Sequence, residues 1–125
     1  MAHKAEFDDV RRLVGEFGSR ATLVTITKSL CPHVVTAIVG VEGERLVAEV
    51  GSRTRSNVVD HPALSVVFSP VGDGEYQLIL DGTAEDVGEP NEDGVSTLRI
   101  AVLGGILHRL AGLPEGPPTC LSLAQ

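Results

Sequence analysis

Apolar and polar positions follow two different periods along this chain, a helical one near the N-terminus and an alternating one afterwards. From Phe7 to Phe17 the apolar residues recur mostly three or four positions apart, with charged residues between them. This is the pattern of an amphipathic helix with one buried side. Gly18 follows the last apolar position, and a glycine there is typical of a helix C-terminus. We therefore predict an N-terminal helix within residues 1–19.

After Ser19 the period becomes two and β-branched residues dominate, which predicts strands. The expected strands are residues 21–27, 33–41, 45–50, 64–68 and 76–87. The strand at 33–41 is apolar on both faces in its middle, so we expect it to be central in the sheet. Gly82, inside the last of these strands, predicts a bend or a bulge.

The segment 95–110 has a spacing of apolar residues that suits a helix as well as a strand. Gly104 and Gly105 are poor helix centres, whereas a strand over 97–103 would complete a closed sheet. We predict a strand there. Residues 113–125 contain three prolines, so we expect them to form a tail that packs on the surface or on a partner.

Together these elements predict one mainly β domain spanning residues 1–125. Gly51 ends the third strand, and a short helix is expected between it and Pro62. Short turns between strands of similar length favour a six-stranded antiparallel barrel with two small helices, because closure hides the apolar edges.

Composition and charge exclude several classes of function. The formal charge of -7 argues against a nucleic-acid partner, since binding to phosphate backbones needs clustered positive charge. No apolar stretch is long enough to span a membrane, and no secretory signal begins the chain, so we expect a cytoplasmic protein. The only cysteines, Cys31 and Cys120, lack the spacing of a disulfide framework or a metal site.

The densest polar cluster is the segment 52–57, Ser-Arg-Thr-Arg-Ser-Asn, which stands where a strand ends and a helix begins. Such a junction offers free backbone N–H groups and the positive end of a helix dipole, and guanidinium groups bind phosphate oxygens in pairs. Arg53, Thr54, Arg55 and Asn57 are therefore candidate phosphate ligands. The alternative is an ordinary surface helix whose arginines form weak ion pairs with acids such as Asp60.

The chain also resembles the pyridoxamine 5'-phosphate oxidase-like split-barrel proteins that bind FMN or F420. The resemblance lies in residues 21–27 (ATLVTIT), 31–35 (CPHVV), 45–50 (RLVAEV), 53–58 (RTRSNV) before His61-Pro62, 80–85 (LDGTAE) and 107–109 (LHR). It covers roughly residues 21 to 110 and supports a split barrel.

This resemblance implies a homodimer with flavin sites at the interface, holding FMN or the deazaflavin F420. The phosphate would lie on Arg53, Thr54, Arg55 and Asn57, as in the candidate cluster above. The ring system would lie along the strand at 33–41, near His33, Val34, Val35 and Thr36.

The chain departs from this family in two places. It lacks the basic and aromatic set that binds pyridoxamine phosphate, so oxidation of that substrate is not expected. The segment 28–31 is more apolar than the usual turn of Asp and Gly, which would alter the ring-binding edge or accompany loss of the cofactor.

The function expected from these features is a flavin- or F420-dependent oxidoreductase acting on a small molecule, with no catalytic side chain required. Two alternatives stay open at this point. One is a non-catalytic protein that binds or carries a flavin or another phosphorylated ligand, and the other is a cofactor-free dimer of the same fold.

Overall fold

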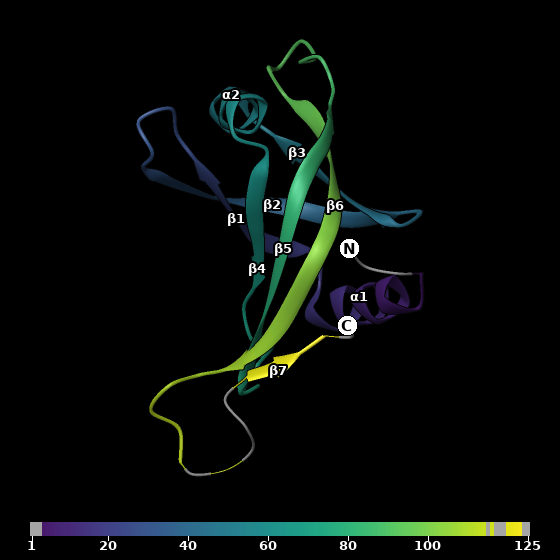
Figure 1. Ribbon diagram of the computed structural model, residues 1–125, viewed down its shortest axis with the longest axis vertical. Helices are drawn as coiled ribbons and strands as arrows, with labels where there is room; N and C mark the ends of the chain where they lie inside the picture. Colours follow the sequence, from purple (N-terminus) through teal and green to yellow (C-terminus); the bar gives the residue numbers. More distant parts are fainter. Residues whose placement is uncertain (1–3, 115, 117–119, 124–125) are drawn as a thin grey trace.

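The computed structural model describes residues 4–114, 116 and 120–123. Its elements are, in order, α1 (Lys4–Phe17), β1 (Arg20–Ile26), β2 (Pro32–Glu42), β3 (Arg45–Val50), α2 (Ser52–Asp60), β4 (Ala63–Phe68), β5 (Tyr76–Val87), β6 (Ser96–Arg109) and β7 (Cys120–Ser122) (Figure 1). Helix α1 confirms the predicted N-terminal helix, of which residues 1–3 lie outside the described part.

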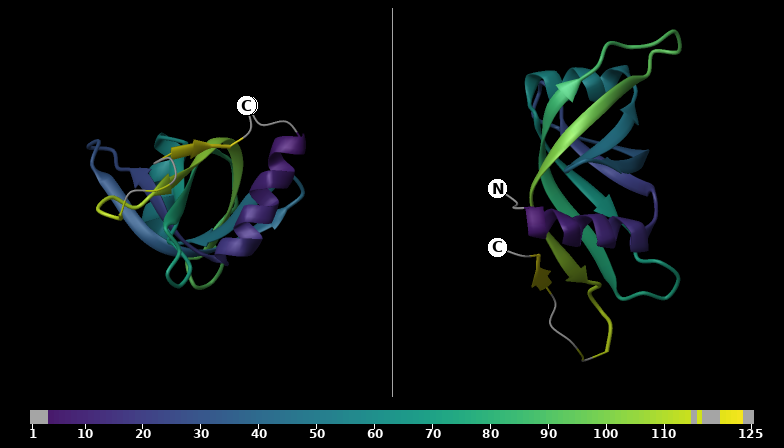
Figure 2. Two further views of the ribbon diagram at one scale, coloured as in Figure 1. Left: turned by 90° about the horizontal axis from the view of Figure 1, so that it is seen from below. Right: turned by 90° about the vertical axis from the view of Figure 1, so that its right-hand side faces the viewer.

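The strands form an antiparallel barrel in the order β3-β2-β1-β4-β5-β6, and pairing of β3 with β6 closes it. Closure runs from the pair Leu46–Ile100 to the pair Val50–Ser96. Seen from below, the strands surround a common core (Figure 2). The fold is therefore the mainly β, six-stranded barrel that the sequence predicts, with β2 paired on both sides.

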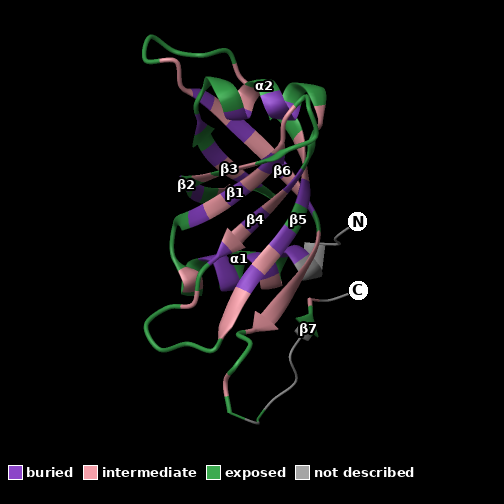
Figure 3. Cartoon of the chain, turned by 90° about the vertical axis from the view of Figure 1, so that its left-hand side faces the viewer, coloured by how far each residue is buried: buried purple, intermediate pink, exposed green. Residues whose placement is uncertain are grey.

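Alternate strand residues fill the interior, as the period of two requires. The fully buried large side chains include Leu23, Val39, Leu46, Val66, Phe68, Leu78, Leu80, Leu98 and Ile100. Burying each side chain of this size contributes about 1.5–3 kcal/mol. Figure 3 shows buried residues alternating with more exposed ones along the strands. Helix α1 buries Phe7, Val10, Leu13 and Val14 against this core, and α2 lies over the opposite end of the barrel (Figure 2).

Gly82 lies at an irregularity in the pairing of β5. The pairing of β5 with β6 shifts register between Asp81 and Gly82, which confirms the predicted irregularity. A Cβ atom at Gly82 would lie 2.7 Å from Ile100 Cγ2 and 2.8 Å from the carbonyl oxygen of Ala101. Because the backbone oxygen cannot easily move, only glycine fits there.

The C-terminal third of the chain differs in part from expectation. Strand β6 runs through Gly104 and Gly105 to Arg109, so the segment 95–110 is a strand, as predicted, and longer than 97–103. The expected tail contains β7, which pairs antiparallel with Ile106–His108 of β6. This stretch of β6 extends beyond the part that pairs with β3, so β7 covers an otherwise open edge. Strand β7 is only three residues long, which is too short for its sequence to show the alternation of apolar and polar residues that predicts a strand.

No helix among the described residues combines the length and the apolarity that crossing a membrane requires.

Candidate functional site

The β1–β2 turn and helix α2 together line an open surface pocket of about 960 Å³. The lining residues come from the β1–β2 turn and from the first half of α2: Thr27, Lys28, Ser29, Cys31, Pro32, His33, Ser52, Arg53, Ser56 and Asn57. We call this the α2 pocket. Its volume lies within the range of about 300–1,000 Å³ that is typical of small-molecule sites.

The β1–β2 turn is held in shape by Thr27. Its backbone N–H donates to the carbonyl oxygen of Cys31 (2.9 Å), and its hydroxyl accepts from the Cys31 N–H (3.0 Å). Its carbonyl accepts from the N–H of Leu30 (2.8 Å), a residue with a positive φ of 67°. These bonds offset the cost of a left-handed leucine and fix where Lys28 and Ser29 stand.

Helix α2 begins at Ser52, and its N-cap residue is Gly51, which has no side chain to cap the first turn. Backbone N–H groups of a first helical turn have no partner within the helix, and the helix dipole places partial positive charge there. Ser52 and Arg53 are exposed at this end. The geometry therefore suits a bound anion.

A buried hydrogen bond ties α2 to the barrel. Asn57 Nδ2 donates to Thr25 Oγ1 at 3.1 Å, and the two residues are only 6% and 1% exposed. His33 stands opposite Thr25 in the β1–β2 register, lines the α2 pocket, and has a buried Nδ1 without a partner among the described residues. The hydrogen bond of Asn57 thus holds α2 in place at the pocket. The Nδ1 atom of His33 can still form a hydrogen bond, since it has no partner among the described residues.

The cations of the α2 pocket differ from most of the arginines that the structure describes elsewhere. Arg11, Arg12, Arg45, Arg55, Arg99 and Arg109 each form an ion pair with a carboxylate. Lys28 and Arg53 form no ion pair with any described residue, and both line the pocket. In a chain of net charge -7, two unpaired cations therefore converge on one hollow.

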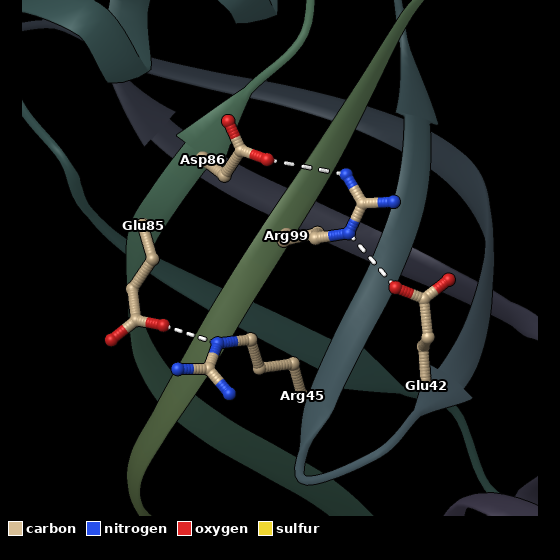
Figure 4. A network of polar contacts seen from close by, with 5 residues as sticks. All are labelled: Glu42, Arg45, Glu85, Asp86 and Arg99. Atoms are coloured by element: carbon tan, nitrogen blue, oxygen red, sulfur yellow. Dashed lines mark hydrogen bonds and ion pairs between the residues drawn. The ribbon is translucent and has the colours of Figure 1, made fainter.

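The network of charged residues on β2, β3, β5 and β6 shows the opposite arrangement (Figure 4). Arg99 donates to Glu42 (2.9 Å) and to Asp86 (3.2 Å), and Arg45 donates to Glu85. The hydrogen bond and charge of Glu42, followed by the contribution of Asp86, raise the pKa of Arg99 above its ordinary value. These arginines are already neutralised, so this network offers no comparable site for an anion.

The structure divides the predicted phosphate cluster between two sides of α2. Arg53 and Asn57 line the α2 pocket, as does His33. Arg55 instead donates from Nε to the Gly88 carbonyl and from Nη2 to Glu89, both at 3.2 Å, and lines a separate hollow of about 320 Å³. Thr54 is buried at 2% exposure and lines neither hollow.

The expected ring-binding residues alternate across β2. Val34 and Thr36 are exposed on the outer face of the barrel, and Val35 is half-buried and packs against the core. Of the predicted ring contacts, only His33 lines the α2 pocket.

Sequence reasoning missed Lys28 as a functional candidate. The residue stands in a turn between two strands, and its only sequence signal is that it is one of the chain's two lysines. What brings it to Arg53 is the packing of α2 beside the β1–β2 turn. No group of three or more potential metal ligands occurs among the described residues.

Comparison with known proteins gives distant matches. No family model matches the chain. Uncharacterised proteins of Mycobacterium bovis and Mycobacterium tuberculosis are each 30% identical over 81 residues, which cover 62% of this chain and 56% of theirs. The chain therefore spans little more than half the length of these curated relatives.

Several solved structures resemble the fold of this chain. An F420 reductase has a TM-score of 0.62 at 14% identity, covering 69% of this chain and 87% of its own. A putative pyridoxamine 5'-phosphate oxidase from Listeria innocua has a TM-score of 0.66 at 13% identity, covering 81% and 96%. A heme-binding protein from Mycobacterium smegmatis has a TM-score of 0.67 at 16% identity, covering 98% and 59%. The chain has the split-barrel fold of the pyridoxamine 5'-phosphate oxidase-like proteins, as the resemblance in sequence implies.

Proposed function

We propose that this protein binds a flavin-type nucleotide, FMN or F420, with its phosphate in the α2 pocket, and serves as an oxidoreductase for a small molecule. The observation that carries the proposal is the convergence of unpaired Lys28 and Arg53 on the uncapped start of α2. An anion placed there would gain two charge-assisted contacts and the helix dipole without displacing any described carboxylate.

The residues present fit such a group. Ser52, Ser56 and Ser29 add hydroxyl donors around the two cations, and the volume of the pocket matches a ligand of nucleotide size. His33 also lines the pocket, and its buried Nδ1 has no hydrogen-bond partner among the described residues. A flavin supplies hydride or electron transfer when bound, and the chain's part is to hold it by the phosphate and to orient it.

The decisive measurement compares FMN with riboflavin, which has the same ring but no phosphate, in a calorimetric or fluorescence titration. We expect FMN to bind at least about tenfold more tightly, because one charge-assisted contact contributes about 1.5–3 kcal/mol. Inorganic phosphate should compete with FMN. Equal affinity for riboflavin and FMN would refute a phosphate site.

Two further titrations separate the possible ligands. F420 in place of FMN identifies which flavin-type nucleotide is preferred. Haemin serves as a competing ligand because a structural neighbour is a heme-binding protein. Binding of haemin without binding of either flavin would overturn the proposal.

Whether the bound flavin is used catalytically is a separate question. The protein loaded with FMN should be reduced by NADPH faster than free FMN is reduced. If F420 is the bound nucleotide, the protein should instead accelerate electron transfer from reduced F420 to a test acceptor. Tight binding without acceleration would instead assign a carrier role to the same pocket.

A further inference from the structure

Leu30, in the β1–β2 turn, combines two features that are each uncommon for a leucine. Its φ of 67° lies in the left-handed region, and no other described residue apart from glycines has a positive φ. It is also 72% exposed, the highest value among the large apolar residues that the structure describes. The left-handed backbone is costly for a residue with a bulky side chain, and so large an exposure means that packing within the chain does not offset this cost.

The turn needs the backbone of Leu30 but not its side chain. The N–H of Leu30 donates to the Thr27 carbonyl (2.8 Å), and a glycine could form the same hydrogen bond without strain. Leu30 belongs neither to the buried core nor to the partly buried residues that pack against it. A strained residue of this kind, at the edge of a candidate site, points to a contact with something outside the chain.

The place of Leu30 indicates what that contact is. Its neighbours Ser29 and Cys31 both line the α2 pocket, so Leu30 stands at the rim of this pocket. Most of the lining side chains carry hydroxyl, amide or cationic groups, and Pro32 is the only hydrocarbon among them. A flavin has a flat ring as well as a phosphate, and the polar lining offers that ring little apolar contact.

We propose that Leu30 contacts the ring of the flavin whose phosphate lies in the α2 pocket. The inference rests on the proposed function and adds a residue that the family resemblance does not imply, since the ring contacts expected from it are residues 33–36. It divides the binding of the nucleotide into two parts. Leu30 acts on the ring, whereas Lys28 and Arg53 act on the phosphate.

Leu30→Ala tests the ring contact, because it removes most of the side chain and keeps a Cβ atom on the left-handed backbone. Fluorescence titration should show that FMN and riboflavin each bind about three to ten times more weakly, by the same factor, as expected when part of one leucine is no longer covered. The affinity for inorganic phosphate, measured by calorimetry, should not change.

Leu30→Gly removes the backbone strain together with the side chain. It should weaken flavin binding as much as Leu30→Ala does. It should also raise the urea midpoint of the protein without ligand, because the left-handed backbone costs leucine more than the extra chain entropy costs glycine. A gain in stability with a loss of affinity is the result expected of a residue that serves the ligand and not the fold.

Val71→Ala is the matched control. It shortens an apolar residue that is 58% exposed in the β4–β5 loop, at the end of the barrel away from α2 (Figure 2), and should leave all three affinities unchanged.

Two results would overturn the inference. One is unchanged flavin affinity in Leu30→Ala while FMN still binds more tightly than riboflavin, which would leave the phosphate site intact. The other is a change in sedimentation without a change in flavin affinity, which would assign Leu30 to a contact between protein chains. Failure of the proposed function has a different signature, namely equal affinity of the unaltered protein for FMN and riboflavin.

Discussion

Arg53 and Arg55 lie two residues apart near the start of α2, yet they face different surroundings. Arg55 is held by the Gly88 carbonyl and by Glu89. Arg53 lines the α2 pocket without an ion pair, in the company of Lys28. The comparison shows that a cluster of arginines in sequence does not define an anion site. What defines it is which guanidinium groups the fold leaves without a carboxylate.

The largest effect should come from removing both free cations. We expect Lys28→Ala combined with Arg53→Ala to weaken FMN binding by about 100-fold or more, because each charge-assisted contact contributes about 1.5–3 kcal/mol. A fluorescence titration measures this loss, and riboflavin affinity should change little. If the double variant binds FMN as tightly as the unaltered protein, the α2 pocket does not hold the phosphate, and the contrast between the two sides of α2 has no role in FMN binding.

The next largest effect concerns the support of the pocket. Asn57→Ala removes the buried hydrogen bond to Thr25 and should lower the free energy of unfolding by about 1–3 kcal/mol. Urea denaturation measures it. Ser56→Ala, on an exposed position of the same helix, is the control and should change stability by less than about 0.5 kcal/mol. Equal effects of the two substitutions would show that Asn57 has no special supporting role.

A smaller effect is expected on the paired side of α2. Arg55→Ala should lower the free energy of unfolding by less than about 1 kcal/mol, since its partner Glu89 is largely exposed. FMN affinity should stay within about threefold of the unaltered value. This change is smaller than the loss of about tenfold or more that is expected when one charge-assisted contact to the phosphate is removed. A loss as large as that of Arg53→Ala would place the phosphate on both sides of the helix.

The smallest effect is the one expected of pH on the stability contribution of Arg99. Its raised pKa means that its contribution to stability is complete below the ordinary arginine pKa and is lost only as the pH rises through the still higher value in the folded chain. The difference in stability between the unaltered protein and Arg99→Gln should therefore be constant from about pH 6 to pH 9. Urea denaturation at several pH values tests this, and a difference that varied over the range would contradict the assignment.

Local patterns predicted most of the fold because each rests on neighbouring residues. The alternation in residues 21–27 and 76–87 reproduces the buried and exposed sides of β1 and much of β5. The glycine pair at 104–105 correctly favoured a strand, and Gly82 marked a register shift. Strand β7 escaped prediction because a three-residue strand depends on the edge of β6 that it pairs with.

The candidate site could be predicted only in part. The junction at residues 52–57 was recognisable because a strand end, a helix start and two arginines occur together. The direction of each arginine was not, since Arg55 is oriented by Gly88 and Glu89, more than thirty residues away. Lys28 joins the pocket through tertiary packing, which no local spacing reports.

The sequence by itself determined a mainly β domain with an N-terminal helix and a basic junction after the third strand, because period, turn chemistry and charge act over a few residues. Tertiary structure alone decided that Lys28 and Arg53 share a pocket and that Arg55 is neutralised. The physical reason is that barrel closure and strand register bring distant side chains together, and an unpaired charge can be recognised only once its neighbours in space are known.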